Sequence, residues 1–119
     1  MAWKFNDNSP IYIQLIDIIK HSIVSGAYKD KLPAVRDLAI EAGVNPNTIQ
    51  RAFSELERSG LVKSDRTNGR FVTDDENIIR ELKESLSTTY IDDLFSNLKK
   101  LGLNTKEIKA LVKDWEEKE

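Results

Sequence analysis

The sequence predicts a mainly α fold with a small β-hairpin wing, in which an N-terminal winged helix-turn-helix precedes a C-terminal helical dimerisation tail. Two short patterns of helical spacing meet at Gly43, and a glycine-tipped hairpin follows the second pattern. After Thr73, helical spacing of apolar residues resumes and continues almost to the end of the chain. We therefore divide the 119 residues into a winged domain, residues 1–73, and a helical tail, residues 74–119.

The winged domain opens with a predicted helix that starts after Ser9 and Pro10 and ends before Gly26. Its apolar residues form one helical stripe: Ile11, Leu15, Ile18, Ile19 and Ile23. Trp3 and Phe5 alternate ahead of this helix. They fit a short strand, an aromatic arm on the tail or on a second subunit, or ordinary core packing, which is favoured because aromatic side chains are commonly buried.

Two further helices are expected to meet at a corner. The first has Pro33 at its entry and Gly43 just past its end, where a left-handed residue is favoured. The second, placed at residues 46–59, has Asn45 as N-cap and a proline at its first position. Their buried stripes are Val35, Leu38, Ala39 and Ala42 in the first helix, and Ile49, Ala52, Phe53 and Leu56 in the second.

The outer face of the second helix is polar, and only one member of its row is charged: Asn47, Gln50, Arg51 and Ser54. Asn, Gln and Arg have forked donors and acceptors that match base edges in a major groove of DNA. Thr48 borders the row near the helix N-terminus, where a hydroxyl, free N–H groups and the helix dipole favour a phosphate. Taken alone, the face is equally compatible with an ordinary polar surface.

The predicted hairpin has strands at residues 61–64 and 70–73. Asn68 and Gly69 are expected to supply the positive φ values of a tight turn, and Arg66 and Arg70 flank its tip. Most such hairpins are solvated connections. The position directly after a candidate recognition helix favours instead a wing that reaches a neighbouring groove or phosphate.

These segments resemble the GntR family of bacterial transcription regulators. The resemblance rests on LPAVRDLA, on GVNPNTIQRAF, and on GLV followed by RTNGRFV, and it spans residues 10–73. The form NPNTIQRA and the short tail are most similar to the YtrA subfamily, whose members are small repressors, whereas other subfamilies have larger effector-binding domains. Relatives often lie beside transporter operons and respond to envelope or antibiotic stress.

The resemblance also implies which positions contact operator DNA in relatives: Arg36, Thr48, Gln50 and the wing around Gly69. Asn45, Asn47 and Arg51 are carried over less directly. Two residues depart from the family pattern. Thr67 stands where many relatives have glycine in the wing, and Ala34 replaces a frequent serine whose hydroxyl would suit a phosphate.

The tail predicts a helix that begins near residues 74–76 and keeps apolar spacing up to Gly102: Ile79, Leu82, Leu86, Tyr90, Leu94, Leu98 and Leu101. Poor helix formers at residues 87–89 leave open whether this is one helix or two. A final helix follows, with a capping box of Asn104 and Glu107. Its apolar residues are Ile108, Leu111, Val112 and Trp115, and Leu103 pairs with Ile108 as a hydrophobic staple.

Amphipathic helices that extend beyond a compact domain expose apolar surface, and a second copy is the expected partner because isologous dimers are common. The residues expected to meet in the homodimer are Leu86, Tyr90, Leu94, Leu98, Leu101, Ile108, Leu111 and Trp115. A twofold pair reads two half-sites about 10 base pairs apart. The alternative is a monomer whose tail folds back on its own domain.

Composition excludes several classes of protein. The chain has no cysteine, and its single histidine, His21, has no partner at metal-ligand spacing, so we expect no enzyme site, no metal and no cofactor. Neither a signal peptide nor a long apolar run is present, which predicts a cytoplasmic protein with no membrane partner. The net charge of -2 divides into +2 for residues 1–73 and -4 for residues 74–119, so the tail should point away from phosphate.

The sequence therefore predicts a homodimeric repressor that binds a pseudo-palindromic operator. Gln50 and Arg51 are expected to read bases, Arg36 and Thr48 to fix the register, and the wing arginines to attract phosphate. The alternative is a winged-helix module that binds protein, which exposed apolar anchors on the same face would favour. A small-molecule effector of open identity, bound between tail and winged domain, is compatible with this arrangement.

Overall fold

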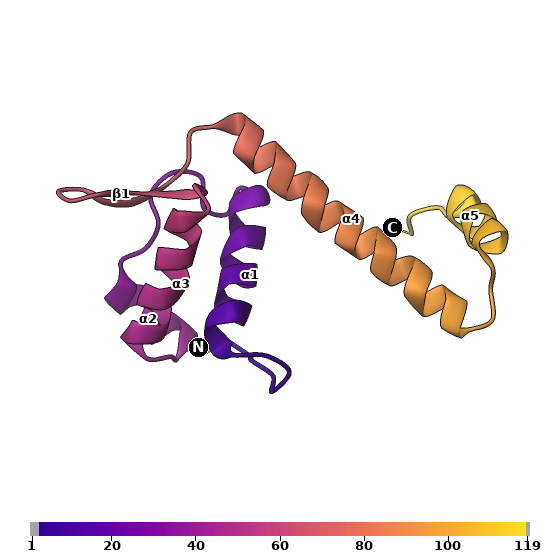
Figure 1. The fold of residues 1–119 in the computed structure, drawn as a ribbon, viewed down its shortest axis with the longest axis horizontal. Helices are drawn as coiled ribbons and strands as arrows, with labels where there is room; N and C mark the ends of the chain where they lie inside the picture. The colour runs from indigo at the N-terminus through magenta and orange to yellow at the C-terminus, as the bar shows by residue number, and fades with distance from the viewer. Residues whose placement is uncertain (1–2, 119) are drawn as a thin grey trace. The chain divides into compact units, whose positions relative to one another are not determined.

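The computed structural model describes residues 3–118, which form five helices and a two-stranded antiparallel sheet (Figure 1). The elements are α1 (Ile11–Val24), α2 (Val35–Ala42), α3 (Pro46–Arg58), β1 (Val62–Asp65), β2 (Gly69–Val72), α4 (Glu76–Lys100) and α5 (Thr105–Asp114). The described residues divide into two compact units between Leu82 and Lys83, within α4. We call residues 3–82 the winged unit and residues 83–118 the tail unit.

This division lies further along the chain than Thr73, where the sequence pattern changes. The reason is that the first turns of α4 still pack against the core of the winged unit, through Ile78, Ile79 and Leu82. The mainly α fold with a hairpin wing and a helical tail is confirmed.

The winged unit is built around three helices whose apolar stripes meet in one core. In Figure 1, α1 and α3 run side by side, and α2 also packs on α3. The largest side chains that are fully buried in this core are Leu15, Ile19, Leu38, Ile49, Phe53, Leu56 and Val62. The predicted stripes are confirmed for α2 and α3, with Val35 partly buried against the core. In α1 the prediction holds for Leu15, Ile19 and Ile23, whereas Ile11 is 43% exposed and Ile18 is only partly buried.

The corner between α2 and α3 forms as its local residues dictate. Gly43 ends α2 in the left-handed conformation, at φ 73°. The side chain of Asn45 then caps α3 by accepting a hydrogen bond from the backbone N–H of Asn47 at 2.8 Å. Pro46 occupies the first helical position, where its missing N–H costs nothing.

The wing turn differs from the prediction in one respect. The paired residues Asp65 and Gly69 enclose a three-residue loop, and Gly69 is at φ 103°, whereas Asn68 does not adopt a positive φ. The expectation that Asn68 and Gly69 both adopt positive φ was wrong. The carboxylate of Asp65 accepts hydrogen bonds from the N–H groups of Thr67 and Asn68, so the loop folds around that side chain and needs only one left-handed residue.

A third segment joins the edge of the hairpin. The N–H of Leu32 donates to the carbonyl of Arg70 at 2.9 Å, and the N–H of Val72 donates to the carbonyl of Asp30 at 2.7 Å. Lys31 therefore pairs with Phe71 in an isolated antiparallel bridge. Residues 30–32, which connect α1 to α2, therefore lie along β2.

The N-terminal aromatic residues pack against the winged core. Trp3 and Phe5 are both partly buried there, and the N–H of Trp3 donates to the carbonyl of Ala42 at 3.2 Å. Residues 3–6 form no strand. Ordinary core packing, the favoured interpretation, is confirmed.

In the tail unit, α4 continues as one helix through residues 87–89, which settles the choice between one helix and two. The hydroxyl of Ser87 donates to the carbonyl of Lys83 at 2.7 Å, so the helix satisfies its polar side chain internally. The predicted capping box of Asn104 and Glu107 at the start of α5 is confirmed. Among residues 3–118, no helix combines the length and apolar character that crossing a bilayer requires.

Candidate nucleic-acid interface

The outer face of α3 is exposed along its length. Its polar row consists of Asn47, Gln50, Arg51 and Ser54, all of them exposed, whereas Ile49, Ala52, Phe53 and Leu56 on the opposite side are buried. The side chain of Gln50 makes no hydrogen bond within residues 3–118, so its donors and acceptors are available to a partner. The helix thus separates a face that fixes it in the core from a face that can form new hydrogen bonds.

Some of the hydrogen-bonding groups at the N-terminus of α3 are already used within the fold. The side-chain oxygen of Asn45 already accepts the N–H of Asn47, so its position is fixed by the cap, while its amide donors stay available for another contact. Thr48 is half-buried, and its backbone N–H donates to the carbonyl of Asn45 at 2.9 Å. Of the predicted residues here, Asn45 and Asn47 are exposed, and Asn47 lies on the same face of α3 as Gln50.

A tyrosine from α1 contacts the polar row of α3. The guanidinium carbon of Arg51 is 3.7 Å from the centre of the Tyr12 ring, a cation–π contact. Ile11, Tyr12, Asn47, Thr48 and Arg51 line one shallow hollow at this point. Tyr12 was not among the predicted site residues. Its position off the buried stripe of α1, next to Ile11, is the signal in the sequence that its ring needs a partner other than the core.

Arg70 points inward rather than toward the wing tip. Its Nε forms an ion pair with Glu57 of α3, and its guanidinium carbon is 5.0 Å from the ring centre of Phe53. The side chains of Arg70 and Glu57 are only 21% and 29% exposed. Glu57 also accepts the hydroxyl of Ser64 at 3.0 Å, so one carboxylate joins both strands of the wing to the recognition helix.

Arg66 at the tip of the wing and Lys31 on the neighbouring segment are exposed cations with no ion pair among the described residues, whereas the exposed Lys63 of β1 is paired with Asp74 at 3.0 Å. A Cβ built on Gly69 would be 3.3 Å from the side chain of Lys31, which shows that this lysine lies over the wing turn. Lys31 was not among the predicted site residues, because its position over the wing depends on pairing with β2. The amide of Asn68 donates to Asp65 at 3.0 Å and thus supports the turn.

Arg36 on α2 is exposed, and like Arg66 it forms no ion pair or side-chain hydrogen bond within residues 3–118. Hydrogen bonds lower the pKa of Asp65 below its usual value, the largest cause being the backbone N–H of Thr67, followed by the side chain of Asn68. The wing turn therefore holds this carboxylate in its charged form. No group of three or more His, Cys, Asp or Glu residues that could hold a metal occurs in the described chain.

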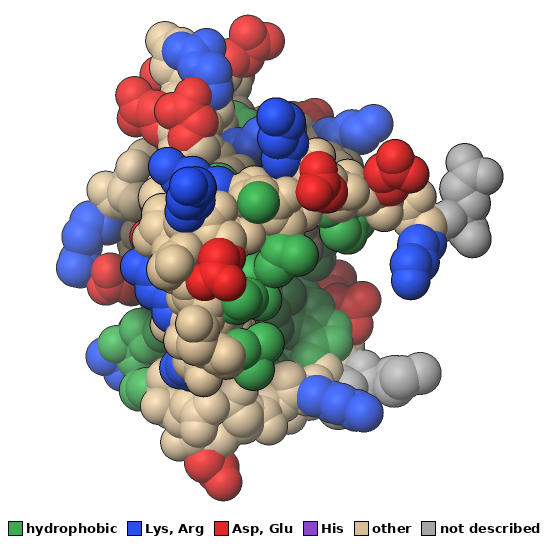
Figure 2. Space-filling model, turned by 90° about the vertical axis from the view of Figure 1, so that its right-hand side faces the viewer, with side chains coloured by type: hydrophobic (Ala, Val, Ile, Leu, Met, Phe, Trp, Pro, Cys, Tyr) green, Lys and Arg blue, Asp and Glu red, His purple; other side chains and the backbone are tan. Residues whose placement is uncertain are grey.

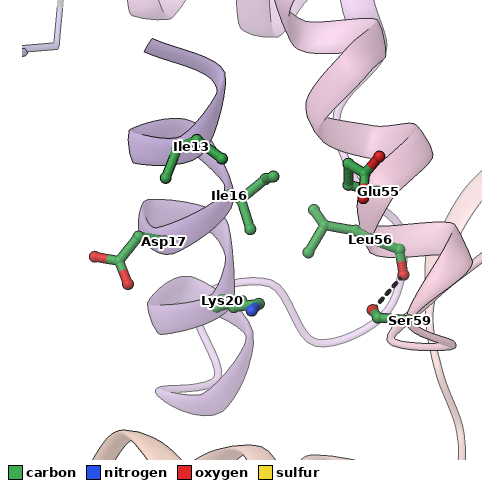
Figure 3. Close-up of a pocket in the computed structure, with 7 residues that line it drawn as sticks. All are labelled: Ile13, Ile16, Asp17, Lys20, Glu55, Leu56 and Ser59. Atoms are coloured by element: carbon green, nitrogen blue, oxygen red, sulfur yellow. Dashed lines mark hydrogen bonds between the residues drawn. The ribbon is translucent and has the colours of Figure 1, made fainter. Parts of the chain in front are cut away.

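A second hollow lies between α1 and α3 (Figure 3). Ile16 and Leu56 point toward each other across it, while Asp17 points away. The rim combines Lys20 with the acidic Glu55, and Glu55 is itself paired with Arg58 at 3.2 Å. This hollow uses other residues of α3 than the polar row.

The fold, the exposed row and the wing agree with a known family. The family model for "Bacterial regulatory proteins, gntR family" matches residues 11–72 of this chain. The chain belongs to the GntR family. This match spans α1 to β2, which includes every predicted DNA-contacting residue.

Two curated relatives match the chain over most of their length. The "Uncharacterized HTH-type transcriptional regulator YhcF" of Bacillus subtilis is 39% identical over 116 residues, covering 96% of both chains. The "HTH-type transcriptional repressor YtrA" of the same organism is 37% identical over 116 residues, covering 89% of both. The similarity to the YtrA group is therefore confirmed.

Solved structures show the same fold. A GntR family transcriptional regulator from Listeria monocytogenes superimposes with a TM-score of 0.82 at 39% identity, covering 94% of this chain and all of that one. AraR(DBD), solved in complex with operator ORX1, superimposes with a TM-score of 0.55 at 28% identity, covering 61% of this chain and 95% of that one. The first match includes the tail, and the second shows the winged fold of a protein bound to its operator.

Proposed function

We propose that this protein is a homodimeric transcriptional repressor that acts in the cytoplasm by binding a pseudo-palindromic operator. The proposal places α3 of each protomer in a major groove, where Gln50 and Arg51 read base edges. Arg36 and Thr48 contact the backbone, while Arg66 and Lys31 of the wing attract neighbouring phosphates. Occupancy of the operator would block the promoter that contains it.

The single observation behind this proposal is the exposed polar row of α3, whose hydrogen-bonding groups have few partners in the fold. Exposed aromatic or aliphatic anchors, which a protein-binding surface would need, are missing from this row. The operator complex of AraR supports the assignment because its winged fold matches this one. The relative YtrA is named a transcriptional repressor, which supports repression as the role proposed for this protein.

The homodimer is supported by the tail unit, where large apolar side chains are exposed: Tyr90, Ile91, Leu94, Leu101, Leu111, Val112 and Trp115. Trp115, the largest of them, is 71% exposed. Figure 2 shows that apolar side chains gather together on the face it presents instead of being scattered. Exposed apolar side chains of this size are unfavourable in water, and a second copy would cover those of the tail unit while adding the second half-site contact.

The two hollows between α1 and α3 are lined by residues of these two helices and of the C-cap of α3, and the proposal assigns no effector to either of them. The proposal does not depend on one. Repression would then respond to the amount of protein and to the salt concentration, because phosphate contacts dominate affinity for DNA.

The test is selection of a preferred site from random duplexes, followed by anisotropy titrations on the selected site and on a scrambled duplex. Wild-type protein is expected to prefer the selected site by about 1,000-fold or more. Gln50→Ala is expected to relax preference at one base position by about 1–3 kcal/mol.

Arg36→Ala has a matched control in Arg80→Ala, which removes the same charge from α4, where the side chain of Arg80 donates to Asn77 and to no other residue among 3–118. Arg36→Ala should weaken binding to all sequences and lower the salt slope by about 1, whereas the control should leave both unchanged. Absence of any preferred site would refute the proposal and favour a protein partner.

A further inference from the structure

We propose that Tyr12 of α1 is a specificity-determining positioning residue, which holds the guanidinium of Arg51 in the orientation that reads a base. This inference rests on the proposed function, since it assigns a role within the same interface. The observation behind it is the stacked geometry of the pair, 3.7 Å from guanidinium carbon to ring centre. At this distance the ring face lies in direct contact with the cation.

The stack fixes a side chain that would otherwise be mobile. Arg51 is exposed on α3 and forms no ion pair within residues 3–118, so the Tyr12 ring is its main restraint. An arginine side chain has many rotamers, and a base contact requires one of them. A restraint present before binding reduces the entropy lost on binding.

A stack against the flat face leaves the edge of the guanidinium free. The N–H groups that form two parallel hydrogen bonds with O6 and N7 of a guanine all point outward in the guanidinium plane. A salt bridge to a carboxylate would instead occupy those N–H groups. Tyr12 therefore orders Arg51 without using the donors that recognition needs.

Arg70 provides the contrast within the same unit. It also lies against an aromatic ring, that of Phe53, but its Nε is paired with Glu57 and its side chain is mostly buried. Arg70 contacts a ring and is also paired with a carboxylate, so its N–H donors stabilise the fold. Arg51 is stacked and unpaired, and it faces solvent beside Asn47 and Thr48. The difference assigns Arg51 and not Arg70 to base reading.

The position of Tyr12 also brings α1 into the interface. Ile11 and Tyr12 form one wall of the hollow, and residues of α3 form the other. The recognition surface is thus composed of two helices, and the identity of residue 12 should influence which base is preferred opposite Arg51. Among proteins with this fold, an aliphatic residue at this position would leave the arginine free to contact phosphate instead.

The first experiment measures the stack in the free protein by NMR. Ring current from Tyr12 should shift the side-chain resonances of Arg51 upfield. Tyr12→Phe should retain that shift, and Tyr12→Leu should abolish it. Unchanged Arg51 resonances in Tyr12→Leu would show that the stack does not persist in solution and would overturn the proposal without bearing on the proposed function.

The second experiment measures base preference with a duplex series in which each position of the selected site is varied. Arg51→Ala first identifies the position that Arg51 reads, as the one where preference is lost. Tyr12→Leu is expected to reduce preference at that same position by about 5- to 30-fold, because the energy of a stacked cation is lost there. Tyr12→Phe should keep the wild-type preference.

A double variant separates positioning from a merely structural role. If Tyr12 acts through Arg51, adding Tyr12→Leu to Arg51→Ala causes no further loss of base preference. A uniform loss of affinity for every duplex, with the same size in both backgrounds, would show that Tyr12 only stabilises α1. Ile11→Ala serves as the matched control, since it alters the same wall of the hollow without the ring.

Thermal unfolding of each variant checks that the fold is intact. Should Tyr12→Leu not fold, Tyr12→Met replaces it, since a long unbranched side chain can fill the hollow without providing a ring. Wild-type protein that shows no base preference would refute the proposed function. Wild-type preference that Tyr12→Leu leaves unchanged would refute only the role of Tyr12.

Discussion

The winged unit and the tail unit are built from helices with similar apolar spacing, yet the winged unit buries far more of its apolar residues. Of the fifteen buried hydrophobic residues in the described chain, Ile108 alone belongs to the tail unit, and α4 contains none. An amphipathic helix is stable in a globular protein when another surface covers its apolar face. The winged unit supplies that surface from its own chain, and in the proposed homodimer a second copy would supply it to the tail unit.

The largest effect should come from opening the winged core. Phe53→Ala removes the largest fully buried side chain and also the ring on which Arg70 lies. We expect a loss of about 3–5 kcal/mol in the free energy of unfolding, measured by denaturant titration. The matched change in the tail, Leu111→Ala, alters a side chain that is 52% exposed and should cost the isolated protomer far less. Equal losses in the free energy of unfolding for the two variants would contradict the difference in burial between the two units.

The next effect tests whether the tail meets a second copy. Leu94→Glu places a charge in the proposed interface and should raise the dimer dissociation constant by about 100-fold or more, as measured by sedimentation equilibrium. Ser96→Glu adds the same charge at an exposed polar position two residues away and should change it little. If wild-type protein is monomeric at micromolar concentration, the interpretation of the tail is wrong.

A smaller effect distinguishes the two wing arginines. Arg70→Ala leaves Glu57 half-buried without its cation and should reduce stability by about 1–3 kcal/mol. Arg66→Ala should leave stability unchanged but lower the salt slope of DNA binding by about 1. Arg70→Lys keeps the charge and should restore only part of the stability, because a lysine cannot stack flat on Phe53. The reverse pattern, with Arg70→Ala acting only on the salt slope, would make Arg70 a phosphate contact.

The smallest effect concerns pH and the wing turn. Because the folded state lowers the pKa of Asp65, the turn is stabilised at every pH above the ordinary carboxyl value, and this contribution disappears as the pH falls through the lowered value. The N–H resonances of Thr67 and Asn68 should report the change in an acid titration. Asp65→Asn should remove the titration from both. A midpoint at or above the usual carboxyl value would contradict the assignment.

Local signals explain which parts of the fold the sequence could predict. Gly43, Asn45 and Pro46 define the corner before α3, and Asn104 with Glu107 defines the start of α5, because each acts on backbone groups within four residues. Helical spacing likewise predicted the buried faces of α1 to α3. These features depend on short stretches of chain, and the structure confirms them.

Contacts between distant residues were not predictable in this way. The pairing of Lys31 with Phe71, the stack of Arg51 on Tyr12 and the inward turn of Arg70 join segments far apart in the sequence. The positive φ expected at Asn68 failed for a different, local reason. It assumed a generic two-residue turn, while the side chain of Asp65 organises a longer one. The exposed row of α3 was predictable, but which of its members are restrained was not.

The most direct test of the account is the mass of the complex that the protein forms on its selected operator, measured by analytical ultracentrifugation with full-site and half-site duplexes. The account predicts two protomers on the full site. It also predicts that affinity falls by about 100- to 10,000-fold when one half-site is scrambled, because the second contact then loses its linkage through the tail. A single protomer on the full site, or equal affinity for both duplexes, would contradict the claim that the tail unit joins two winged units on DNA.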